Sequence, residues 1–72
     1  MNNKTTKIYK LGRAIFAQRR NLGLSQNALA DKLNISREHL AKIETAKRTV
    51  SLDLLINISE VLNVKVKDLI DF

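Results

Sequence analysis

The stretch that decides the fold runs from Ser25 to Thr45 and reads SQNALADKLNISREHLAKIET. Ser25 and Ser36 are suitable N-caps, because a hydroxyl can accept a backbone N–H that the first helical turn leaves unpaired. Apolar side chains follow the two caps at helical spacing, at Leu29, Ala30 and Leu33 and then at Leu40 and Ile43. Asn34 tolerates the left-handed conformation that often ends a helix. The stretch therefore predicts two short helices, residues 25–33 and 36–45, joined by a tight turn.

A turn of three residues (34–36, with the cap Ser36 counted) between two helices is the length of a helix-turn-helix connection, whose second helix enters the major groove of DNA. The stretch resembles the helix-turn-helix of the Cro and lambda-repressor type. The resemblance extends to residues 23–26 (GLSQ), Glu44, Lys47, Arg48 and residues 54–70 (LLINISEVLNVKVKDLI), and it covers about residues 11–70. It implies an all-α, compact five-helix lambda-repressor-like domain that binds double-stranded DNA sequence-specifically and regulates transcription.

Composition excludes several other classes of protein. The 72 residues form one small domain, and the absence of Cys excludes disulfides and thiolate metal sites. Strands are not expected, since Val, Ile and Thr do not alternate in runs. The longest apolar run, residues 14–17, is too short to span a bilayer, and no apolar segment of a signal peptide follows the N-terminal lysines. We therefore expect a cytoplasmic protein with no membrane partner, stabilised by helix packing or by dimerisation.

The formal charge of +6 is unevenly distributed. Residues 1–48 carry a charge of +8 and residues 49–72 a charge of −2. This asymmetry suggests one face for a polyanion and another face for a different role. A basic surface that is merely solvated is the alternative, and the helix-turn-helix pattern favours nucleic acid.

The N-terminal third is expected to be an arm followed by a helix. Residues 1–7 are polar and lack periodicity, so we predict a flexible arm over residues 1–6 and the domain over residues 7–72. Lys4 and Lys7 are then candidates for contact with phosphate or the minor groove. The first helix should begin at Thr6 or Lys7 and end at Asn21, with Gly12 permitting close approach of a neighbour. Its predicted inner stripe is Ile8, Leu11, Ile15 and Leu22.

The helix over residues 36–45 is the predicted reader of DNA sequence. At about 100° per residue, Leu40 and Ile43 point inward, while Glu38, Ala41, Lys42 and Thr45 point outward. The resemblance implies base contacts from Arg37, Glu38, Lys42 and Ala41. Arg and Lys donate to guanine, Glu accepts from cytosine, and Ala packs on a thymine methyl. Phosphate contact without sequence information is the alternative for Arg37 and Lys42.

Phosphate contacts are implied for a second set of residues. Gln26 lies in the first turn of its helix, where unpaired N–H groups and the helix dipole favour an anion. The other members of the set are Asn27, His39, Lys47 and Arg48. Solvation alone is the alternative for each of them. Ala46 and Val50 stand where the family usually has Gly and Pro, so the loop carrying the basic pair is expected to differ in shape.

Two further features are structural rather than recognitional. The resemblance implies a structural ion pair between Arg19 and Glu44, and a buried pair is costly to break from one side. The fourth helix is predicted to begin after the N-cap Ser51 and to end at Asn63. Its apolar side is formed by Leu52, Leu55, Ile58, Val61 and Leu62. A short fifth helix is predicted over residues 67–71. The dimer interface is predicted at Leu54, Val66, Ile70 and Phe72, because these four apolar residues are more than one small core needs for its packing. Alternatively, Phe72 folds back on its own core.

The residues do not point to an enzyme. One His, no Cys, no Gly-rich phosphate loop and no paired acids leave no catalytic constellation, and no cofactor or metal is expected. We predict a homodimer whose reader helices lie about 34–36 Å apart on a near-palindromic operator, and which represses by occupying a promoter. Activation through RNA polymerase, as in restriction–modification controller proteins of similar size, is one alternative. An antitoxin whose main partner is a toxin protein, with DNA binding for autoregulation, is another.

Overall fold

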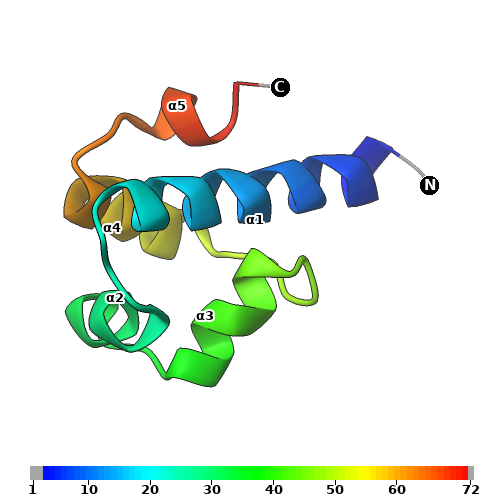
Figure 1. Cartoon of the computed structure of the whole chain (residues 1–72). Coiled ribbons are helices and arrows are strands. Elements are labelled where there is room, and N and C mark those ends of the chain that lie inside the picture. The colour runs from blue at the N-terminus through cyan, green and yellow to red at the C-terminus, as the bar shows by residue number, and fades with distance from the viewer. Residues whose placement is uncertain (1–2, 72) are drawn as a thin grey trace.

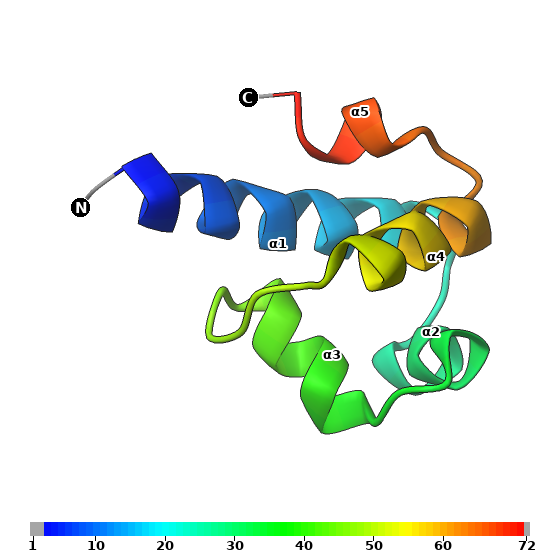
Figure 2. The ribbon, with the colours of Figure 1, turned by 180° about the vertical axis from the view of Figure 1, so that it is seen from behind.

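Five helices account for all the regular secondary structure of residues 3–71, the part of the chain that the computed structural model describes. They are α1 (Asn3–Asn21), α2 (Gln26–Leu33), α3 (Arg37–Glu44), α4 (Leu52–Leu62) and α5 (Val66–Leu69). The long helix α1 crosses the molecule, with α2 and α3 on one side of it and α5 on the other (Figure 1). Seen from behind, α4 lies against α1 and connects the α3 side to the α5 side (Figure 2). The prediction of an all-α, five-helix domain is confirmed.

Short polar side chains set the helix ends, as the sequence predicted. The Oγ atoms of Ser25, Ser36 and Ser51 each accept the backbone N–H three residues further on, at 3.0, 3.0 and 3.1 Å. Such a cap contributes about 1 kcal/mol to stability. Asn34 and Asn63 end α2 and α4 in the left-handed conformation, with φ of 58° and 57°. The turn between α2 and α3 is therefore determined by residues within a few positions of it.

Helix α1 begins earlier than the sequence predicted. It starts at Asn3 rather than at Thr6 or Lys7, so residues 3–6 are helical. Neither Pro nor Gly interrupts this turn, and Lys4 lines a groove together with the loop that follows α3. Met1 and Asn2 lie outside the described residues, and the flexibility of residues 1–6 stays a prediction.

One apolar core joins all five helices. Its members are Ile15, Leu29, Ala30, Leu33, Leu40, Ile43, Leu55, Ile58, Leu62 and Leu69, all at most 8% exposed. Burying a Leu or Ile side chain fully contributes about 1.5–3 kcal/mol, and nine of these ten residues are Leu or Ile, so their burial is a large favourable contribution to folding. The inward faces predicted for residues 25–33 and 36–45 are confirmed.

Two apolar residues assigned to inner faces are exposed instead, and those predictions are wrong. Leu22 is 51% exposed, because α1 ends at Asn21 and the turn at Gly23 (φ 71°) takes Leu22 away from the stripe. Leu24 packs against the core in its place. Leu52 is 69% exposed, because it is the first residue of α4 and lies beyond the edge of the core.

The packing of α1 on α3 depends on Gly12. A Cβ atom at this position would lie 2.6 Å from the carbonyl oxygen of Ile43 and 2.8 Å from that of Glu44. Only a residue without a side chain lets the two backbones approach so closely. This contact confirms the expected role of Gly12 and sets how far α3 stands from the rest of the molecule.

Candidate nucleic-acid interface

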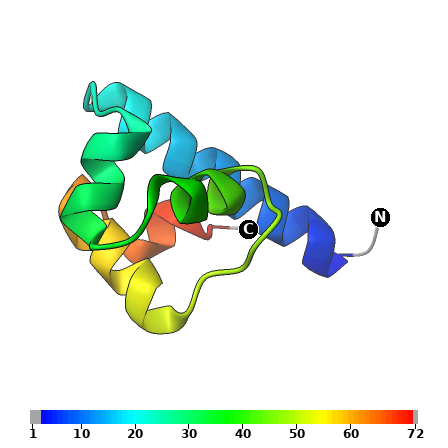
Figure 3. The ribbon, with the colours of Figure 1, turned by 90° about the horizontal axis from the view of Figure 1, so that it is seen from below.

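The polar face of α3 is not covered by the rest of the described chain. Arg37, Glu38 and Lys42 are exposed and Ala41 is half-buried. Seen from below, α3 faces the viewer and no other helix lies across it (Figure 3). The opposite face of α3 is anchored by Leu40, Ile43 and Glu44, all buried. The predicted readers therefore lie together on a protruding, well-anchored helix.

Two of the predicted readers bind each other in the free protein. The Nζ of Lys42 lies 3.2 Å from the Oε1 of Glu38, one helical turn away, and the two side chains are 48% and 75% exposed. An exposed ion pair of this kind contributes only about 0.3–0.5 kcal/mol. The pair can open at little cost, which leaves both charged groups available to another molecule.

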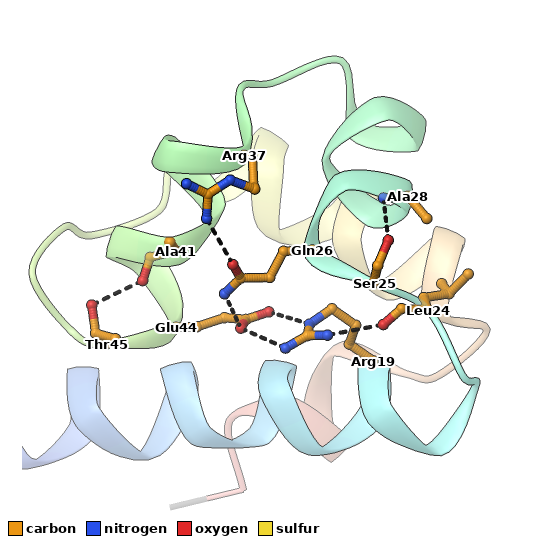
Figure 4. A network of polar contacts seen from close by, with 9 residues as sticks. All are labelled: Arg19, Leu24, Ser25, Gln26, Ala28, Arg37, Ala41, Glu44 and Thr45. Carbon is orange, nitrogen blue, oxygen red and sulfur yellow. Dashed lines mark hydrogen bonds and ion pairs between the residues drawn. The ribbon is translucent and has the colours of Figure 1, made fainter.

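A buried ion pair fastens α3 to α1. Arg19 donates from Nε to the Oε2 of Glu44 at 2.7 Å and from Nη2 to Oε1 at 3.0 Å (Figure 4). Its Nη1 donates to the carbonyl oxygen of Leu24 at 2.9 Å, just ahead of α2. Arg19 is 6% exposed and Glu44 is 4% exposed, so the pair is dry. The geometry is the bidentate one in which Arg–carboxylate pairs are strongest.

Gln26 extends this ion pair to the surface. Its Nε2 donates to the Oε1 of Glu44 at 3.0 Å, and its Oε1 accepts from the Nη1 of Arg37 at 3.2 Å (Figure 4). A continuous chain of polar contacts therefore runs from Arg19 in α1 through Glu44 and Gln26 to Arg37 at the start of α3. Sequence reasoning did not find the link between Gln26 and Arg37, since eleven residues separate them. Phosphate contact by Gln26 stays a prediction beside this positioning role.

The remaining phosphate candidates surround α3. Asn27, Lys47 and Arg48 are exposed, and His39 is half-buried on the flank of α3. Ala46 has a φ of 62°, the left-handed conformation that favours Gly, so the loop turns here with Ala where Gly is usual. The turn is closed by a 2.8 Å hydrogen bond from the N–H of Lys47 to the carbonyl of Lys42. The basic pair Lys47 and Arg48 follows directly after this turn.

The apolar residues predicted to form a dimer interface are only partly available. Leu54 and Val66 are half-buried and pack against the core, whereas Ile70 is 39% exposed. Phe72 lies outside the described residues. The most exposed apolar side chains of α4 are Leu52 and Ile56, at 69% and 41%, one turn apart. Sequence reasoning did not assign them to the surface, because Leu52 fits the helical spacing of the inner face.

The chain is similar in sequence to known helix-turn-helix proteins. A family model described as Helix-turn-helix matches residues 15–69. The control protein C.BamHI of Bacillus amyloliquefaciens is 43% identical over 49 residues, which are 68% of this chain. The matched part spans 60% of the length of that relative.

The fold is shared with solved structures of regulators. The restriction–modification controller protein C.AhdI from Aeromonas hydrophila superposes with a TM-score of 0.84 and 26% identity, over 89% of this chain and 97% of that one. The clp gene regulator ClgR from Corynebacterium glutamicum superposes with a TM-score of 0.82 and 27% identity, over 86% of this chain and 80% of that one.

Proposed function

The chain belongs to the helix-turn-helix family of DNA-binding transcription regulators, and we propose that it recognises one operator sequence through α3. The observation that carries this proposal is the exposed polar face of α3, a helix that the buried contacts of Glu44 with Arg19 fasten to α1. A rigid helix that protrudes from its domain matches the shape of the major groove.

Each predicted reader has a definite chemical task in that groove. Arg37 and Lys42 donate to the O6 and N7 of guanine, and Glu38 accepts from the N4 of cytosine. Ala41 is small enough to pack on a thymine methyl. Glu38 also repels phosphate when α3 is misplaced, which penalises the wrong register. Opening the exposed Lys42–Glu38 pair costs little, so recognition is not limited by that contact.

The polar chain through Gln26 pre-orients the first reader. Arg37 has many rotamers, and ordering a long side chain costs up to about 2 kcal/mol. Arg37 is hydrogen-bonded to Gln26, which is itself bound to the buried Glu44, so part of the conformational entropy of Arg37 is already lost before DNA binds. We propose that the N–H groups at the start of α2, together with Asn27, His39, Lys47 and Arg48, contact the flanking phosphates.

We propose that the active form is a homodimer on a near-palindromic operator. Leu52, Ile56 and Ile70 are apolar side chains exposed by 69%, 41% and 39%, and a second copy packed on them would remove them from water. Two copies related by a two-fold axis would present their α3 helices to successive major grooves, about 34–36 Å apart. Repression by occupying a promoter needs no further domain. The likeness to the restriction–modification controller protein C.AhdI and to the control protein C.BamHI favours control of the genes of a restriction–modification system as the biological role.

Selection from random duplex DNA tests the assignment of readers. We expect wild type to select a motif with two-fold symmetry, and Arg37→Ala or Lys42→Ala to lose the preference at one base pair per half-site, by about 1–3 kcal/mol. Lys32→Ala is the matched control, because Lys32 is an exposed cation at the end of α2 and not a predicted reader. Absence of any selected motif contradicts specific readout. An unchanged motif with both reader variants contradicts the assignment of Arg37 and Lys42.

A further inference from the structure

A groove of about 480 Å³ lies away from the readers, between the N-terminal half of α1 and the loop that follows α3. Figures 1 and 2 both show that loop beside the N-terminal half of α1. The floor of the groove is apolar and is formed by Ile8, Leu11, Ile43 and Val50. The volume is within the range of sites that bind small molecules.

The rim of this groove carries charge of a single sign. Lys4 and Lys7 on α1 and Arg48 on the loop line it, and none of the carboxylates within residues 3–71 does. Among residues 3–71, none of these three cations makes an ion pair. A second groove, beside Tyr9, differs because Asp71 lies there with Lys10 and Arg13. The first groove therefore differs from the second in having cations but no carboxylate among the described residues that line it.

We propose that the first groove binds a small amphipathic anion, an aliphatic carboxylate, and that its occupancy weakens DNA binding. The apolar floor removes the hydrocarbon chain from water, while the three cations attract the carboxylate. A DNA phosphate would pair with the cations of the rim and leave the apolar floor in contact with water. An uncharged apolar molecule would leave the cations without a partner.

The coupling to DNA comes from Arg48. This side chain lines the groove and is also one of the proposed phosphate contacts, so a bound carboxylate competes with DNA for it. Loss of this phosphate contact in both protomers of the proposed homodimer, at about 0.1 M salt, weakens DNA binding by about ten- to a hundredfold and lowers the salt slope by about two. This second part rests on the proposed DNA binding, whereas the binding of the anion does not.

Calorimetric titration with octanoate, followed by amide NMR shifts, tests the site. We expect saturable binding with shifts at residues 7–11 and 48–50. Acetate should bind about tenfold or more weakly, because it lacks the chain, and octanamide about fivefold more weakly, because it lacks the charge. Equal binding of acetate or octanamide, shifts centred on Leu52 and Ile56 instead, or no binding at all would overturn the site.

Matched variants locate the anion. Ile8→Gln removes part of the floor and should weaken octanoate binding about tenfold without unfolding the protein, since Ile8 is half-buried and outside the described core. Lys7→Gln should weaken it about two- to fivefold, while Lys10→Gln, the same change outside this groove, should not. Equal effects of Lys7→Gln and Lys10→Gln would overturn the proposed rim, and wild-type affinity in Ile8→Gln would overturn the floor.

A final measurement separates the site from its effect on DNA. Saturating octanoate should weaken binding of the proposed homodimer to the selected duplex about ten- to a hundredfold. Ile8→Gln should need about tenfold more octanoate than wild type to reach half of that effect. Octanoate binding with unchanged DNA affinity would overturn the regulatory part alone. If selection yields no DNA motif, the proposed function fails while the calorimetry still decides the site.

Discussion

Replacing Gly12 by Ala tests whether close backbone contact positions α3. The added Cβ would lie 2.6 Å from the oxygen of Ile43 and 2.8 Å from that of Glu44, whereas ordinary contact begins at 3.4 Å. The obstacles are backbone atoms, which cannot move aside by changing rotamer. Helix α3 must therefore shift by about 0.4–0.8 Å, and Glu44 would be drawn away from Arg19 as it does so.

The expected cost follows from two opposing terms. Overpacking a well-packed interior costs about 1–3 kcal/mol, and backbone obstacles place this site at the upper end. Ala is about 1 kcal/mol better than Gly in the interior of a helix, which offsets part of that cost. The net loss of unfolding free energy is then about 1–2 kcal/mol. In a domain of this size, that loss lowers the melting temperature by about 5–15 °C.

Urea denaturation followed by circular dichroism measures this difference. Ala17→Gly is the matched control, because Ala17 is an exposed position of the same helix and reports the helix propensity alone. Ala17→Gly should lower the unfolding free energy by about 1 kcal/mol. Gly12→Ala would raise the unfolding free energy by the same amount if the added Cβ met no other atom. NMR shifts of the Arg19 Nε–H should accompany the destabilisation. A Gly12→Ala protein as stable as wild type, or more stable, would refute the packing argument.

Three other predictions test separate features. Glu44→Gln leaves the Arg19 guanidinium buried without a counter-charge and should lower the unfolding free energy, measured in urea, by about 3 kcal/mol. Breaking a buried pair from one side costs about 3–5 kcal/mol, and the amide keeps some of the hydrogen bonds. A loss under about 1 kcal/mol would show the pair to be dispensable. Ala46→Gly relieves the strain of a side chain at the left-handed φ of 62°. The unfolding free energy should rise by about 0.5–1 kcal/mol, after subtraction of the greater freedom of Gly in the unfolded chain. Thermal melting measures this change, and a lower melting temperature would contradict the assigned strain. The double change Leu52→Gln and Ile56→Gln should shift sedimentation from dimer toward monomer, with little change in the melting temperature. Tyr9→Gln, at a residue 53% exposed on α1, should leave sedimentation unchanged. Equal shifts in sedimentation for both proteins would count against α4 as the interface.

The elements that could be predicted from the sequence are those completed within a few residues of chain. Three serine caps, the two asparagine ends and the apolar spacing of α2 and α3 each depend on neighbours no more than four or five positions away. The same holds for the outward face of α3, because a helix that buries Leu40 and Ile43 must expose Glu38 and Lys42. Helical spacing therefore predicts which side chains of α3 face outward, and the resemblance to the family implies which of them contact bases.

Only the tertiary structure decided how those elements meet. The link from Gln26 to Arg37, the groove between α1 and the loop after α3, and the exposure of Leu22 and Leu52 all depend on where chain ends and turns place distant segments. Helical periodicity gives the direction of a side chain around its own axis, and it contains no information on where the neighbouring helix stops. That distance is set by packing, as the contact of Gly12 with the backbone of α3 shows.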